Sequence, residues 1–132
     1  MSESIIDPVE FTQSLISCPS VTPKDAGVMK TLQDQLEKIG FNCTRMSFDE
    51  AETDTVDNLF ATYGTGSPHL CFGGHTDVVP VGNLDSWTND PFDPVIKDGK
   101  LYGRGTADMK SAIAAFTAAA SNYINQNEFQ GT

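Results

Sequence analysis

The stretch CFGGHTDVVPVG, residues 71–82, places two polar side chains between two apolar runs. An apolar segment enters a pair of glycines, and His75 and Asp77 follow before the chain returns to apolar residues. α/β folds hold their sites just beyond the carboxyl ends of strands. A histidine is a common metal ligand, and a nearby carboxylate can hold its second nitrogen. The stretch also allows a turn in which a backbone carbonyl bonds His75 and Asp77 caps the turn.

Helical and strand patterns alternate on both sides of this stretch. Asp7 followed by Pro8 is typical of a helix start, and Asp98-Gly99 between apolar arms predicts a hairpin. The expected helices cover residues 7–17, 26–39 and 108–126, and the expected strands cover 41–48, 56–63 and 69–74. This alternation indicates an α/β sandwich. A helix that crosses a sheet normally delivers another strand, and none is predicted after residue 126, so we expect an incomplete sheet.

Composition and charge exclude several classes of function. The formal net charge of −10 argues against nucleic acid as a partner, since phosphates require a basic surface. Apolar runs are too short for a membrane span, and residues 1–11 lack the pattern of a secretory signal, so we expect a cytoplasmic protein. Cys18, Cys43 and Cys71 are widely spaced and form no C-x-x-C pair. They predict buried free thiols in a reducing compartment rather than disulfides or a thiolate zinc site.

Asp108 lies in a second polar stretch, GRGTADMK, at the start of the last expected helix. Aspartate is a preferred N-cap residue, so capping is an alternative to metal binding. A phosphate-binding loop is disfavoured, because Met109 rather than glycine precedes Lys110. The dinucleotide pattern also fails, since Asp108 takes the place of its third glycine.

Taken together, GGHTDVVPVG and YGRGTADMK resemble the metal-site segment of the M20 family of zinc-dependent exopeptidases and deacylases. The resemblance implies a partial α/β/α sandwich of the zinc-exopeptidase type. It implies two Zn²⁺ ions per complete site, with Co²⁺ as a possible substitute. His75 would ligate one ion, Asp108 would bridge both, and Asp77 would orient His75 as a catalytic residue. A cis peptide after Asp108 is also implied.

Within the family, the chain is most similar to the desuccinylases, which hydrolyse N-succinyl-LL-2,6-diaminopimelate to succinate and LL-2,6-diaminopimelate. The implied partner is therefore a small N-acyl amino acid, in a homodimeric enzyme of lysine and diaminopimelate biosynthesis. Another deacylase, such as acetylornithine deacetylase, and an inactive fragment are the alternatives. Residues 1–132 are expected to form the N-terminal part of the catalytic domain. The family's general-base glutamate, its further ligands and its dimerisation domain have no counterpart here, so we expect this chain alone to be inactive.

Overall fold

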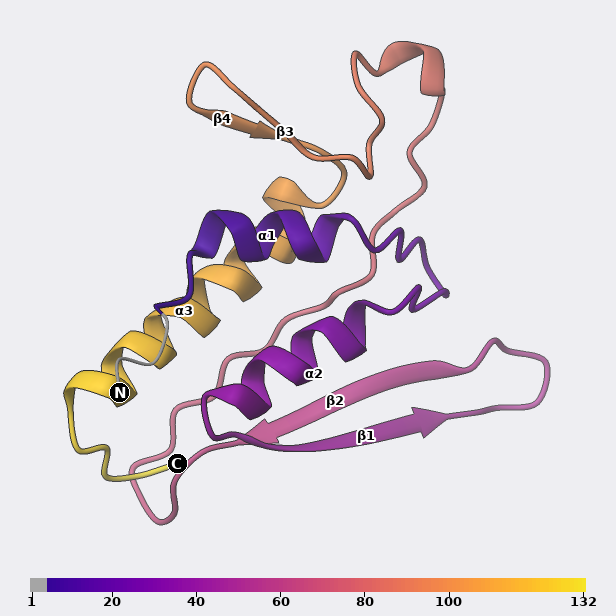
Figure 1. Ribbon diagram of the computed structural model, residues 1–132. Coiled ribbons are helices and arrows are strands. Elements are labelled where there is room, and N and C mark those ends of the chain that lie inside the picture. Colours follow the sequence, from indigo (N-terminus) through magenta and orange to yellow (C-terminus); the bar gives the residue numbers. More distant parts are fainter. Residues whose placement is uncertain (1–4) are drawn as a thin grey trace.

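The computed structural model describes residues 5–132 of the chain. Helices and strands are mixed along it, as expected for an α/β protein (Figure 1). The elements are α1 (Pro8–Ile16), α2 (Val28–Lys38), β1 (Asn42–Phe48), β2 (Val56–Thr62), a 3-10 turn (Leu84–Ser86), β3 (Val95–Lys97), β4 (Lys100–Tyr102), an irregular turn (Thr106–Lys110) and α3 (Ser111–Gln126).

Local sequence signals explain where the first helices form. The Asp7 carboxylate accepts hydrogen bonds from the amides of Val9 and Glu10, at 2.7 and 3.1 Å, and Pro8 opens α1 as predicted. In α2, buried apolar residues recur every four positions, at Val28, Leu32 and Leu36. This spacing gives α2 one apolar face, which it buries in the core.

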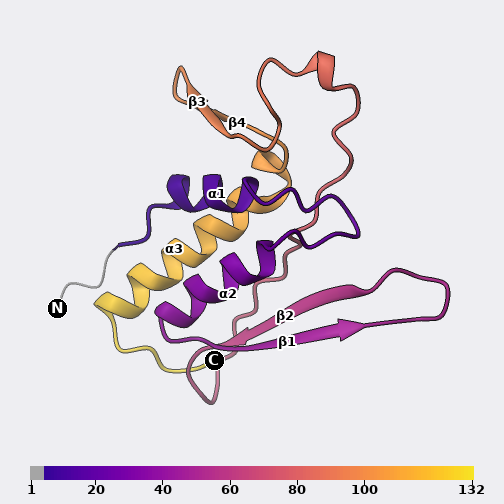
Figure 2. The same ribbon diagram turned by 45° about the vertical axis from the view of Figure 1, so that its right-hand side comes forward.

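The core lies between the helices and one face of β1 and β2. α1 packs against α3, and α2 packs against both strands (Figures 1 and 2). The buried core residues are Ile6, Phe11, Leu15, Val28, Leu32, Leu36, Ile113 and Ala114. Because α1 and α3 share this core, the loop after α1 and the turn before α3 are held close to each other.

Two antiparallel hairpins are present, and the one at Asp98-Gly99 confirms the predicted hairpin. β1 and β2 pair antiparallel from Asn42 opposite Thr62 to Phe48 opposite Val56. β3 and β4 pair around Asp98-Gly99, where φ is 51° and 71°. Positive φ at both central positions is the requirement of a tight type I′ turn, and Asp-Gly meets it at little steric cost.

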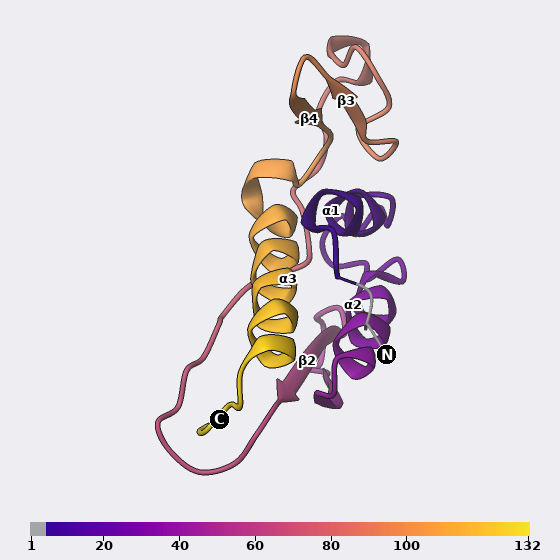
Figure 3. The same cartoon turned by 60° about the vertical axis from the view of Figure 1, so that its left-hand side comes forward.

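The strand predicted over 69–74 is wrong: this segment is extended chain that runs beside α3 without strand pairing (Figure 3). A strand exists only where a neighbour takes its backbone hydrogen bonds. Near this segment the Leu70 amide donates to Thr132 O at 2.9 Å, and the Thr132 amide donates to Pro68 O. Side-chain packing holds the remainder of this segment against α3, since the rings of Phe72 and Phe116 stack with their centroids 4.6 Å apart.

The cysteine prediction is correct in part. All of Cys18, Cys43 and Cys71 are free thiols, but Cys71 is exposed and the other two are half-buried. Cys71 belongs to the unpaired segment just described, which leaves its side chain open to solvent. Among residues 5–132, no helix has the length and apolar character needed to cross a membrane.

Candidate metal centre

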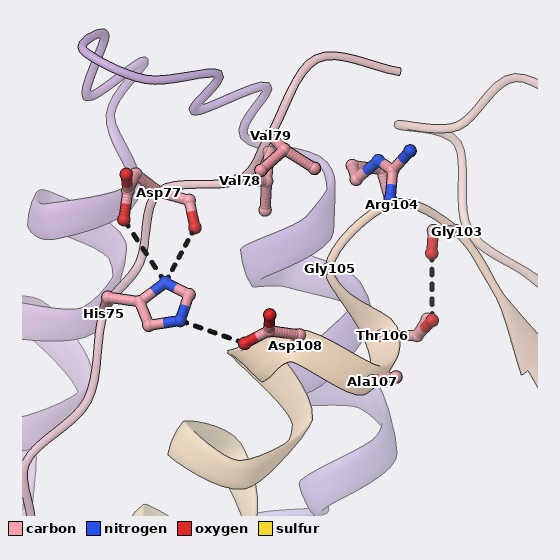
Figure 4. A pocket seen from close by; sticks show the side chains of 10 residues that line it. All are labelled: His75, Asp77, Val78, Val79, Gly103, Arg104, Gly105, Thr106, Ala107 and Asp108. Carbon is pink, nitrogen blue, oxygen red and sulfur yellow. Dashed lines mark hydrogen bonds and ion pairs between the residues drawn. The ribbon is translucent and has the colours of Figure 1, made fainter. Parts of the chain in front are cut away.

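His75 and Asp108 lie 33 positions apart in the sequence, and the fold brings their side chains into contact. The distance from His75 Nε2 to Asp108 Oδ1 is 3.0 Å (Figure 4). His75 comes from the extended segment, and Asp108 comes from the irregular turn before α3. The expected proximity of the two side chains is therefore found, while their roles as metal ligands remain predictions.

Asp77 faces the other nitrogen of the same ring. His75 Nδ1 lies 3.0 Å from the Asp77 carbonyl oxygen and 3.2 Å from its carboxylate Oδ1 (Figure 4). Two acceptors on one nitrogen favour a proton there, which leaves Nε2 as the lone-pair nitrogen of the neutral ring. Nε2 is the atom that points to Asp108. The backbone carbonyl and the carboxylate of Asp77 both contact His75, and the metal-ligand role of His75 stays a prediction.

These contacts change the acidity of the ring. The hydrogen bond to the Asp77 carbonyl raises the pKa of His75 above its usual 6.5, and the Asp108 carboxylate adds to the rise. Partial burial acts in the opposite direction. In the metal-free chain the ring therefore carries a proton more readily than an isolated histidine does.

The backbone before α3 aims Asp108 at His75 instead of at the helix. The N-cap position of α3 is Lys110, and a cis peptide joins Asp108 to Met109, as the family resemblance implies. The alternative in which Asp108 caps the helix is therefore wrong. Gly105 starts this turn with φ at 91°, and a Cβ there would lie 2.9 Å from Val78 Cγ1. Only glycine combines this conformation with such close packing.

A shallow pocket of about 200 Å³ opens over these side chains. Its lining includes His75, Asp77, Asp108 and Arg104 (Figure 4). The Arg104 guanidinium lies 5.2 Å from the centre of the Trp87 ring and donates to Pro80 O at 3.4 Å. Sequence reasoning had not identified this stacking arrangement.

Lys110 is a second residue whose environment the sequence did not reveal. Its side chain is fully buried, and Nζ donates to the carbonyls of Leu15 and Cys18, each at 2.8 Å. Burial lowers the pKa of Lys110 to about 8, so the amine still carries a charge at pH 7. A lysine two positions after an aspartate gives no signal in the sequence for such distant carbonyl partners.

The donor geometry fits a zinc ion. Two atoms bound to one tetrahedral zinc at about 2.0–2.1 Å lie roughly 3.3 Å apart, close to the observed 3.0 Å. Imidazole nitrogen and carboxylate oxygen are both normal zinc donors. Within residues 5–132, no cluster of three or more His, Cys, Asp or Glu side chains has metal-site geometry. The described residues therefore offer part of a donor set.

Comparison with known proteins shows which protein family the site segment matches. The profile of peptidase family M20/M25/M40 matches residues 71–132, the part of the chain that holds both His75 and Asp108. The chain is 55% identical over 126 residues to a succinyl-diaminopimelate desuccinylase of Parvibaculum lavamentivorans, and 62% identical over 117 residues to that of Caulobacter vibrioides. Residues 71–132 match the M20 family. These alignments cover 96% and 89% of the chain but only 32% and 29% of the two relatives. The chain thus spans about a third of the length of these relatives.

The fold of the chain also matches a solved structure. Human carnosine dipeptidase 1 superposes with a TM-score of 0.79 over 92% of the chain and 29% of that protein. The sequences are 24% identical, so this likeness concerns the fold alone. The α/β class predicted from the sequence is confirmed by the structure and by this neighbour.

Proposed function

We propose that this chain is part of a two-zinc amide hydrolase that converts N-succinyl-LL-2,6-diaminopimelate to succinate and LL-2,6-diaminopimelate. The single observation that carries the proposal is the 3.0 Å contact between His75 and Asp108, at the place where the two family motifs meet. The names of relatives at 55% and 62% identity support this substrate over that of another deacylase.

Each residue of the centre has a distinct proposed role. His75 would hold one ion through Nε2, Asp108 would hold two ions, and Asp77 would accept the hydrogen bond of Nδ1–H, which fixes the orientation of the ring. Zinc bound there would polarise the amide carbonyl and lower the pKa of a bound water towards about 7. Co²⁺ would substitute for it, since the same nitrogen and oxygen donors suit both ions.

We further propose that residues 1–132 are the N-terminal part of a larger catalytic domain. Two donors do not complete a site, since catalytic zinc normally has three protein ligands and an open position. The general base, the other ligands and a dimerisation domain would lie in the region of the relatives that this chain does not match. We place the assembled enzyme in the cytoplasm as a homodimer.

A hybrid protein tests the proposal. In it, residues 1–132 replace the matching region of the Parvibaculum lavamentivorans desuccinylase. The hybrid should release succinate from N-succinyl-diaminopimelate, lose this activity with a chelator, and regain it with Zn²⁺ or Co²⁺. The 132-residue chain alone should be inactive in the same assay. A folded hybrid that binds zinc but does not hydrolyse the substrate would contradict the proposed function.

A further inference from the structure

The loop after α1, residues 17–22, is bonded to the segment that carries His75. The buried Ser20 hydroxyl donates to Thr76 O at 2.7 Å. The Val78 amide donates to Ser20 O at 2.9 Å, and the Thr22 amide donates to Val78 O at 3.0 Å. The peptide that separates the candidate ligand from its carboxylate partner is therefore held by a buried hydroxyl and a parallel backbone bridge.

The same part of the chain is bonded to the turn that carries Asp108. Lys110 lies two positions beyond this aspartate, and its ammonium donates to Leu15 O and Cys18 O. Leu15 lies in the last turn of α1, where the helix dipole favours a positive charge. Lys110 thus ties the turn before α3 to the end of α1.

Close packing at Gly105 links the Ser20 contacts with the His75 segment to the Lys110 contacts with the end of α1. A Cβ at Gly105 would lie 2.9 Å from Val78 Cγ1 and 3.2 Å from Lys110 Cδ, so both side chains press on this glycine. The Lys110 amide also donates to Gly105 O at 2.9 Å. Buried and closely packed groups resist displacement, since movement would open voids or leave the buried Lys110 ammonium without its acceptors.

We propose that Ser20 and Lys110 are positioning residues that set the spacing between His75 and Asp108. Ser20 fixes the backbone of the first ligand segment, and Lys110 fixes that of the second, both against the end of α1 and its loop. This inference rests on the proposed function, because it assigns a purpose to the spacing of two metal ligands. A purely structural role would lower stability and leave the loaded metal site unchanged.

Cobalt binding to the hybrid protein separates these roles. Ser20→Ala removes the hydroxyl with little change in volume, and Lys110→Met keeps the apolar stem without the ammonium. Thr117→Val is the matched control, since its buried hydroxyl also donates to a carbonyl, that of Ile113 at 2.8 Å, within α3. We expect Ser20→Ala and Lys110→Met to weaken Co²⁺ affinity about 10–100-fold and to change the visible spectrum at saturating Co²⁺. Thr117→Val should do neither.

Hydrogen exchange in the 132-residue chain provides a readout that is independent of metal. The Val78 amide should exchange about tenfold faster or more in Ser20→Ala and Lys110→Met than in the parent chain, and should be unaffected by Thr117→Val. Unchanged cobalt spectra together with unchanged exchange at Val78 would overturn the positioning role. A parent hybrid that binds no Co²⁺ would instead contradict the proposed function, and exchange at Val78 would still decide the role of Ser20 and Lys110.

Discussion

Asp77→Ala should weaken zinc binding only moderately, because His75 Nδ1 has two acceptors and the substitution removes one. The carboxylate lies at 3.2 Å, while the backbone carbonyl at 3.0 Å remains in the variant. Loss of a partner that orients a ligand typically costs about 10–100-fold. Both side chains are about half exposed, at 49% and 51%, which weakens the charge interaction through solvent screening. We therefore expect a loss near the lower limit, about tenfold or 1.4 kcal/mol.

The assay is zinc competition with a chromophoric chelator in the hybrid protein, with succinate release measured in parallel. His75→Ala should lose the bound ion, since it deletes a ligand atom, and Asp77→Asn should lose less than Asp77→Ala, since the amide keeps an acceptor. Asp85→Ala, an exposed aspartate in the 3-10 turn, is the control. Equal zinc loss in Asp77→Ala and His75→Ala would refute the assignment of Asp77 as an orienting residue.

Other predictions concern the pH dependence of stability, the close packing at Gly105 and the cap of α1. Because the pKa of His75 is raised, its protonation stabilises the metal-free chain below about pH 6.5, and this contribution is lost as pH rises through the raised pKa. Zinc affinity should instead increase as pH rises, because zinc binds the unprotonated ring nitrogen. His75→Ala should abolish the pH-dependent stability in urea unfolding. Gly105→Ala should cost about 1–3 kcal/mol more than Gly66→Ala in urea unfolding, since both glycines have positive φ but only Gly105 lacks room for a Cβ. Asp7→Ala should cost about 1 kcal/mol in the same assay through loss of the cap of α1, and no change in unfolding free energy would argue against that cap.

Features with local signals were predictable from the sequence. Asp7 and Pro8 mark the start of α1, and Asp98-Gly99 marks the turn of β3 and β4. Such signals operate within a few residues, so they do not depend on the rest of the fold. The strand expected over 69–74 failed because pairing depends on neighbouring strands, which apolar composition does not specify.

The site was predictable only in its motif residues. His75, Asp77 and Asp108 were identified through the family resemblance, and the structure brings them together. Ser20 and Lys110 were missed, since their partners are backbone carbonyls 56 to 95 positions away. Any residue type presents a backbone carbonyl, so the sequence contains no complementary partner for them.

The central claim is that His75 and Asp108 bind the same metal ion. The most direct measurement is a crystal structure of the zinc-loaded hybrid, with the metal located by anomalous scattering at the zinc edge. The account predicts an anomalous peak about 2 Å from both His75 Nε2 and an Asp108 carboxylate oxygen. A zinc ion bound elsewhere, or one that contacts His75 while the Asp108 side chain points away from it, would contradict the account.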